Sequence, residues 1–276
     1  MQQLVSFLVV VRIDTGKMSA YYGLYIVLSL VFKIFGSIVK ILRLNVAANA
    51  LKAHFSCLII GLVPLVVEGL AETGRISKVN ISKPGALKGI RILEAGCGGG
   101  ILAEDLAKLG AYVVGVDPGK EMIRLAKNHL ETKSSELINL IEYHDVTVEE
   151  HVKEFAGAYD AVVCSEVLEH VDEKEAILEA CIRCLKPGGS LFITTENRTM
   201  LAWLFFIIIP EYILSFLPKG THFYEKFVSP NTISKLIVRY GCKTRRVRGF
   251  FYDRMYNSWG FIDDDSCNYG LHATRC

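Results

Sequence analysis

The chain has 276 residues, a formal net charge of +2 and 51% hydrophobic residues. That length suits one α/β domain with an appended segment and excludes two large domains. The nearly balanced charge gives no argument for nucleic-acid binding, so we expect no nucleic-acid partner. The mean hydropathy of +0.32 is high for a freely soluble domain and predicts membrane contact somewhere in the chain.

The first zone, residues 1–67, is apolar and basic, with six lysines and arginines against the single acid Asp14. This composition resembles an organelle-targeting segment. The uncharged run at 20–32 is shorter than the ~20 residues of a membrane span, but continuing past Lys33 would reach that length. We therefore predict a targeting or membrane-associated segment, with a poorly ordered N-terminus as the alternative.

The second zone alternates short apolar runs with helical patterns, which is typical of βαβ units and a parallel sheet. In chain order, the pattern predicts strand 90–95, helix 101–109, strand 111–116, helix 120–130, strand 138–143, strand 160–165, helix 174–185 and strand 190–195. The sequence Lys186-Pro-Gly-Gly ends the last helix, because proline and glycine terminate helices.

The third zone begins at residue 196 and breaks this alternation. Two apolar stretches, 200–209 and 212–217, flank Pro210, and a helix is predicted over 231–240. Two late β-like runs, 244–252 and 269–274, are predicted to pair as a hairpin at the sheet edge. We thus divide the chain into segment 1–67 and domain 68–276, with a core at 88–195 and an insertion at about 196–230.

The eight cysteines are scattered along the chain, as free thiols in a reducing compartment would be. Cys181 and Cys184 form a lone CxxC inside a helical pattern, and no second pair of ligands follows at zinc-binding spacing. We interpret both as half-buried helix residues.

A glycine-rich turn follows the first predicted strand in the sequence EAGCGGG, residues 94–100. Gly96 and Gly98 allow the backbone to approach a ligand closely. Dinucleotide-binding folds also place glycines here, but their third glycine or alanine is replaced by Ile101. Glu94, just before the turn, suits a ligand with a cationic amino-acid end, which S-adenosylmethionine has and NAD lacks.

Asp117 ends the second predicted strand, 21 residues after Gly96. A carboxylate at this place can accept hydrogen bonds from both ribose hydroxyls of a cofactor. The alternative is a helix N-cap, because Pro118 would suit the first helical position. The two roles are compatible.

Ser165 ends the fourth predicted strand, and Glu166, Glu169 and His170 follow it. Ligands of open α/β sheets bind at the carboxyl ends of the strands. The carboxylates and imidazole suit either oxygen-rich Mg²⁺ ligation or a general base for a phenolic proton. The alternative is a solvated loop of charges.

With the E-x-G-x-G-x-G turn, the Asp117 spacing and the closing LKPGGSLFITT strand, residues 88–195 resemble the class I methyltransferase fold. The resemblance implies a Rossmann-like α/β fold with a mostly parallel seven-stranded sheet and a C-terminal antiparallel hairpin.

Two further segments narrow the resemblance. PKGTHFYEKFVSP, residues 218–230, and NYGLH, residues 268–272, are similar to segments of the ubiquinone-biosynthesis O-methyltransferases. That family implies methyl transfer from S-adenosylmethionine to a polyprenylated dihydroxybenzoate and to a demethylubiquinol. By position, Gly96, Asp117 and Ser165 match its cofactor contacts, and Glu166, Glu169 and His170 match its magnesium ligands.

The resemblance also implies a mitochondrial location on the matrix side of the inner membrane and membership of a multi-subunit biosynthetic complex. The apolar segment Leu201–Leu217 is a candidate for membrane docking or for binding the polyprenyl tail, with a buried core helix as the alternative. A metal-free mechanism with His170 as base also remains open.

Two features depart from the family. Leu62 stands where an arginine that touches the cofactor is expected, and the N-terminal third is unlike the family. Two other functions therefore stay open: a class I methyltransferase acting on another small molecule or lipid, and a weakly catalytic cofactor-binding scaffold subunit.

Overall fold

The computed structural model describes residues 62–78, 83–215, 217–253 and 258–276. The chain divides into two compact units, Met1–Asn49 and Ala50–Cys276. The first unit lies outside the described residues, as does nearly all of the predicted targeting segment. The described sheet, helices and candidate site all belong to the second unit.

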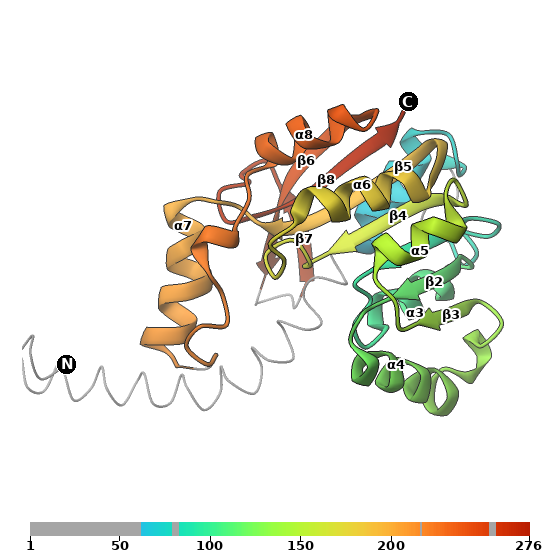
Figure 1. Cartoon of the computed structure of the whole chain (residues 1–276), viewed down its shortest axis with the longest axis horizontal. Coiled ribbons are helices and arrows are strands. Elements are labelled where there is room, and N and C mark those ends of the chain that lie inside the picture. Colours follow the sequence, from blue (N-terminus) through green and yellow to red (C-terminus); the bar gives the residue numbers. More distant parts are fainter. Residues whose placement is uncertain (1–61, 79–82, 216, 254–257) are drawn as a thin grey trace, which may run out of the picture. The chain divides into compact units, whose positions relative to one another are not determined.

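A mixed sheet of eight strands organises the described residues (Figure 1). Five parallel strands form one half, and three antiparallel strands complete it. In spatial order they are β3 (Ile141–His144), β2 (Tyr112–Val116), β1 (Arg91–Ala95), β4 (Tyr159–Ser165), β5 (Leu185–Glu196), β8 (Asn268–Arg275), β6 (Cys242–Asp253) and β7 (Ser258–Ile262). The Rossmann-like α/β prediction is confirmed.

The C-terminal part differs from the prediction in two details. The sheet has eight described strands instead of the seven expected, because β7 forms between the two late runs, where no strand was predicted. The predicted antiparallel pairing of the two late runs is confirmed, because β6 pairs with β8, but β8 also pairs with β5 and the outer edge is formed by β7. The long strand β6 pairs with β8 along one edge and with β7 along the other, which accommodates the additional strand.

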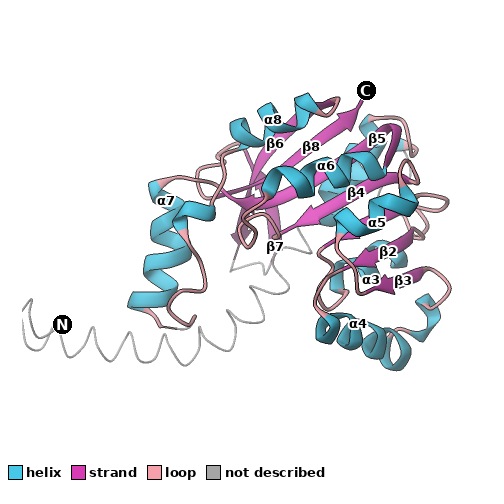
Figure 2. Ribbon diagram, in the orientation of Figure 1, coloured by secondary structure: helices cyan, strands magenta, loops and turns pink. Residues whose placement is uncertain are grey.

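Helices cover both faces of the sheet (Figure 2). Residues 62–72, α3 (Ile101–Lys108) and α4 (Lys120–Lys133) pack on one face, and α5 (Val148–Phe155), α6 (Lys174–Cys184) and α8 (Pro230–Arg239) on the other. Alternate strand residues supply the two cores: Ile92 belongs to the first and Leu93 to the second. Burial on both faces explains the apolar run at residues 161–164 of β4.

Helix α5 was absent from the sequence interpretation, although it has a clear start signal. The Thr147 hydroxyl accepts from the backbone N–H of Glu150, whose carboxylate in turn accepts from the N–H of Thr147. This capping box stabilises a short amphipathic helix. Cys181 and Cys184 are both fully buried on α6, so they are core residues, more buried than predicted.

The segment after β5 forms α7 (Met200–Ala202), which continues into an irregular π-type helix, η3 (Trp203–Ile213), with Pro210 inside it. A 3₁₀ turn, η4 (Tyr224–Lys226), comes next. Several large apolar side chains of this segment are exposed, among them Phe205 at 52%. Within the described ranges, no helix combines the length and apolar character that crossing a membrane requires.

Candidate active site

The glycine turn after β1 depends on backbone conformations that glycine adopts most readily. Gly96, Gly98 and Gly100 all have positive φ angles, of 75°, 49° and 78°. A Cβ on Gly96 would collide with Val167, whereas at Gly98 it would meet nothing within 4 Å. The turn therefore packs tightly on one side and leaves open space on the other, where a ligand can approach the backbone.

Glu94 lies at the base of this turn and is almost completely buried. Its Oε2 atom has no hydrogen-bond partner among the described residues. The pKa of this carboxyl is raised to about 8, mainly by burial; the hydrogen bond from the backbone of Ala103 lowers it, and the charge of Asp117 adds a smaller rise. A buried carboxylate with a free oxygen is suited to receive a cationic group from a ligand.

Asp117, at the end of β2, uses both of its oxygens. Oδ2 accepts from the backbone N–H of Gly98 at 3.0 Å, and Oδ1 accepts from the N–H of Gly119 at 2.7 Å. The N-cap of α4 is Gly119, so the N-cap alternative for Asp117 is wrong: Pro118 lies before the helix. Each oxygen retains a lone pair, which leaves Asp117 able to accept from ribose hydroxyls.

Ser165 is the last residue of β4, and its hydroxyl forms a hydrogen bond of 2.9 Å with the hydroxyl of Thr194 on β5. The next residue, Glu166, adopts a left-handed backbone conformation with φ 54°, which is costly for a residue other than glycine. Its N–H donates to the carbonyl of Thr194 at 3.0 Å. The unfavourable conformation turns the Glu166 side chain toward the cavity rather than along the strand.

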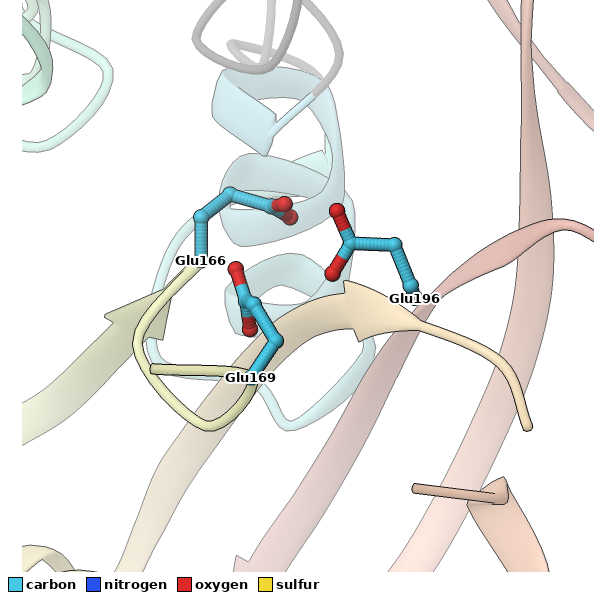
Figure 3. A group of neighbouring side chains, drawn as sticks. All are labelled: Glu166, Glu169 and Glu196. Carbon is cyan, nitrogen blue, oxygen red and sulfur yellow. The ribbon is translucent and has the colours of Figure 1, made fainter. Parts of the chain in front are cut away.

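Three carboxylates meet at this edge of the sheet: Glu166 and Glu169 after β4, and Glu196 at the end of β5 (Figure 3). One oxygen of each lies within 4.8 Å of the others. Burial raises the pKa of all three, and Glu196 and Glu166 raise that of Glu169 further by charge repulsion. The sequence analysis did not predict Glu196 as a site residue. The available signal was its position directly after the predicted strand 190–195, which is the same kind of position that identified Asp117.

His170 is not part of this group. Its imidazole is 56% exposed, and its Nε2 lies 3.8 Å from Glu169 Oε1. Burial, together with the nearby charge of Lys226, lowers its pKa, which favours the neutral imidazole. The Lys226 ammonium donates to the backbone carbonyl of His170 at 3.3 Å and pairs with Asp172. The structure thus joins Glu166 and Glu169 as predicted and leaves His170 at the rim.

A single cavity of about 400 Å³ connects these features. Its lining includes the glycine turn, Glu94, the three carboxylates and His170, and the far wall carries Leu217, Thr221 and His222 of the PKGTH segment. The predicted residues Glu94, Gly96, Gly98, Ser165, Glu166, Glu169 and His170 all line it. Asp117 reaches the cavity wall through its bond to Gly98.

Glu211 on η3 holds the PKGTH wall in place. Its buried carboxylate accepts from the backbone N–H groups of Gly220 and His222 at 2.7 and 2.9 Å. Sequence reasoning did not single out Glu211, since one acid in an apolar helix carries no motif. Leu62, which replaces the expected arginine, is fully buried in the apolar core next to the sheet.

Residues 93–193 match the family model described as a methyltransferase domain. Among solved structures, magnesium protoporphyrin IX methyltransferase from Synechocystis aligns with a TM-score of 0.54 and 21% identity, covering 78% of this chain and 82% of that one. A [4+2]-cyclase aligns at 0.52 with 14% identity, covering 77% and 81%. The fold is the Rossmann-like fold of class I S-adenosylmethionine-dependent methyltransferases, and the cyclase shows that the fold alone does not fix the reaction.

Sequence comparison is more specific. The mitochondrial ubiquinone biosynthesis O-methyltransferase of Homo sapiens is 43% identical over 77% of this chain and 56% of its own length. The bacterial protein of the same name from Acinetobacter baylyi is 40% identical over 69% of this chain and 79% of its own length. The chain belongs to the ubiquinone biosynthesis O-methyltransferase family. It spans about three-fifths of the length of the mammalian relatives it matches.

Proposed function

We propose that this chain transfers a methyl group from S-adenosylmethionine to a ring hydroxyl of polyprenylated dihydroxybenzoate and demethylubiquinol intermediates in ubiquinone biosynthesis. The observation that carries the proposal is the continuous cavity, with the glycine turn and Glu94 at one end and the carboxylate group at the other. Family membership supports the choice of substrate class.

The glycine end fits the cofactor. The free Oε2 of buried Glu94 suits the cationic amino-acid end of S-adenosylmethionine, and the open space beside Gly98 allows close backbone contact. Asp117 would hold the ribose and Ser165 would line the passage to the acceptor. The Synechocystis relative in fold has been solved with S-adenosylhomocysteine bound. When bound, S-adenosylmethionine supplies the electrophilic methyl group on its sulfonium sulfur.

The carboxylate end fits a hard divalent cation such as Mg²⁺, because Glu166 Oε1 and Glu196 Oε2 are buried without a hydrogen-bond partner in the described structure. In our proposal Glu166 and Glu169 hold the ion. The family resemblance also implies His170 as a ligand, but its imidazole lies at the cavity rim and is 56% exposed. When bound, Mg²⁺ would lower the pKa of a coordinated ring hydroxyl below the ordinary phenolic value of ~10.

The alternative is a mechanism without a metal, in which His170 at the cavity rim acts as the general base. Its lowered pKa keeps the imidazole neutral near pH 7, so that it can accept a proton from the ring hydroxyl. The remaining contribution of the chain is positional, because Glu211 fixes the PKGTH wall. Positioning of this kind accounts for ~7 kcal/mol or more of a reaction barrier.

We further propose that α7 and η3 contact the membrane and receive the polyprenyl tail. Exposed apolar side chains on this segment support it, namely Met200, Leu201, Leu204, Phe205, Tyr212 and Ile213.

The matching mammalian proteins are named mitochondrial, and we propose that this chain lies at the matrix side of the inner membrane. Association with other enzymes of the same pathway belongs to this proposal.

The membrane contact predicts that Phe205→Ser lowers the fraction of protein that sediments with liposomes by about tenfold, since one buried aromatic side chain stabilises binding by ~1.5–3 kcal/mol. Val238→Ser on α8 is the matched control, because Val238 is also an exposed apolar residue, at 61%. Equal sedimentation of the two variants would contradict the proposed contact.

The direct test of the proposed function is methyl transfer from labelled S-adenosylmethionine to a dihydroxybenzoate with a short prenyl tail. The full chain is assayed with and without a chelator, and then with added Mg²⁺. Loss with chelator and recovery with Mg²⁺ supports both the reaction and the metal. Transfer indifferent to chelator supports the reaction with His170 as base. Absence of transfer with cofactor binding intact contradicts the proposal and favours another acceptor or a scaffold role.

A further inference from the structure

We infer that Glu196, together with Glu166 and Glu169, forms a three-carboxylate site for a divalent cation, in which Glu196 takes the place expected for His170. The inference rests on the proposed function for the location of the ion and specifies which side chains of this chain hold it.

The position of Glu196 brings it to the other two acids. Glu196 ends β5, and the pairing of Ser165 with Thr194 aligns the ends of β4 and β5. Figure 3 shows the three carboxylates pointing toward one another from these two strand ends. Opposite ligands of an octahedral Mg²⁺ are about 4.2 Å apart, twice a bond of ~2.1 Å. Adjacent ligands are about 3.0 Å apart, and three ligands of one ion include at least two adjacent pairs. The three oxygens lie within 4.8 Å of one another, so they would move closer together around a bound ion.

The second observation is that no lysine or arginine of the described residues pairs with the three carboxylates. Glu196 is 3% exposed, and its Oε2 forms no hydrogen bond in the described part of the chain. Glu166 Oε1 is also buried and unpartnered. Among the described residues, no lysine or arginine forms an ion pair with any of the three carboxylates. Buried acids without a cation are costly, so a bound ion accounts for the arrangement.

Neighbouring groups orient the carboxylates. The hydroxyl of Thr195 donates to Glu169 Oε2 at 2.7 Å, which fixes one carboxylate and leaves its other oxygen for the group. Glu166 retains a left-handed backbone conformation, and such strain is characteristic of residues held for a function. Supporting hydrogen bonds of this kind orient metal ligands in proteins.

Geometry separates Glu196 from His170. The imidazole is more than half exposed, and although its Nε2 lies 3.8 Å from Glu169 Oε1, His170 is not among the described residues whose ligand atoms all lie within 4.8 Å of one another. Glu196, in contrast, has a carboxylate oxygen within 4.8 Å of the ligand oxygens of both Glu166 and Glu169. Three carboxylates form an all-oxygen set, which favours Mg²⁺, Mn²⁺ or Ca²⁺, whereas an imidazole ligand would shift the preference toward Zn²⁺.

The test is Mn²⁺ binding to the full chain in the absence of a methyl acceptor. Electron paramagnetic resonance measures the concentration of free Mn²⁺, and the bound fraction follows by difference. Glu196→Gln keeps the side-chain shape and should weaken Mn²⁺ affinity by at least about tenfold. His170→Asn is the matched variant and should change it by less than about twofold. Binding of S-adenosylhomocysteine to both variants reports that the fold and the glycine end are intact.

Melting temperatures with and without Mg²⁺ separate loss of metal binding from a folding defect in the variants. Without metal, Glu196→Gln should melt at a higher temperature than the unmodified chain, because it removes one buried acid. Added Mg²⁺ should raise the melting temperature of the unmodified chain and of His170→Asn, and leave that of Glu196→Gln almost unchanged.

The outcomes distinguish this inference from the proposed function. Loss of Mn²⁺ binding in His170→Asn with retention in Glu196→Gln overturns the inference and leaves the function intact. An unmodified chain that transfers methyl groups but binds no Mn²⁺ also overturns it. Mn²⁺ binding that depends on Glu196 in a chain that transfers no methyl group supports the inference while the proposed function fails.

Discussion

The two ends of the cavity satisfy their polar groups in different ways. At the glycine end, the chain supplies partners for Asp117, whose oxygens both accept backbone N–H groups, and only Glu94 Oε2 has none among the described residues. At the carboxylate end, Glu166 and Glu196 each keep a buried oxygen without a partner in the described structure. The turn around Asp117 is therefore complete before a ligand arrives, whereas the carboxylate end is stable only with a cation or bound protons. Three changes test this difference, from the largest expected effect to the smallest.

Glu169→Gln should have the largest effect, lowering kcat for methyl transfer by about 100-fold or more, since loss of one positioned electrostatic group in an active site costs on the order of 10²–10³. Affinity for S-adenosylhomocysteine should stay within about twofold of that of the unmodified chain, because the substitution leaves the residues of the glycine end unchanged. Steady-state kinetics and calorimetric titration measure the two quantities. Glu179→Gln, on the surface of α6, is the control. Full activity in the Glu169 variant would reduce the carboxylate group to a structural feature.

Glu94→Gln should alter the pH dependence of stability. The pKa of Glu94 is about 8 in the folded chain and 4.5 as its ordinary value, so between these pH values the folded state holds a proton that the unfolded state has lost. Stability from Glu94 is thus present below pH 4.5 and is lost as pH rises to about 8, by about 1.4 kcal/mol per unit. The melting temperature of the variant, relative to the unmodified chain, should rise across this range.

Melting curves from about pH 5 to 9 without ligand measure this effect. Glu121→Gln is the control, because Glu121 is exposed on α4 and pairs only with Arg124 among the described residues. Parallel curves for the Glu94 variant and the unmodified chain would show that Glu94 has an ordinary pKa, and would remove the argument that it awaits a cationic group.

Asp117→Ala should have the smallest effect, weakening S-adenosylhomocysteine binding by roughly 1–3 kcal/mol through lost hydrogen bonds. Asp117→Asn retains one accepting oxygen, so its affinity for S-adenosylhomocysteine should lie between those of the unmodified chain and the alanine variant. At saturating cofactor, kcat should change little, because the carboxylate end is untouched. Calorimetric titration gives the affinities, and unchanged affinity in the alanine variant would exclude Asp117 from cofactor binding.

The same contrast explains what the sequence could predict. The residues of the glycine end are close together in the sequence. The turn from Glu94 to Gly100 follows one strand and Asp117 follows the next, and the βαβ architecture brings two such positions together. The helices and strands of the core were predicted within a few residues for the same reason, except α5, whose capping signal was overlooked.

The carboxylate end is not local. Glu196 lies thirty positions after Glu166, and only the register between β4 and β5 brings them together. His170, in contrast, is adjacent to Glu169 in sequence, but neighbouring side chains in a turn point in different directions, and its imidazole lies at the rim. Proximity along the chain was therefore a poor guide to which side chains share a site.

The position of β8 has a consequence for synthesis. This strand covers the edge of β5, yet its residues are translated only after η3, α8 and β6. Until then a nascent chain exposes the edge of a long, apolar strand that contains Phe192 and Ile193. Such open edges pair readily with other chains. We expect a truncation before Asn268 to leave a chain that depends on chaperones and aggregates when released from the ribosome.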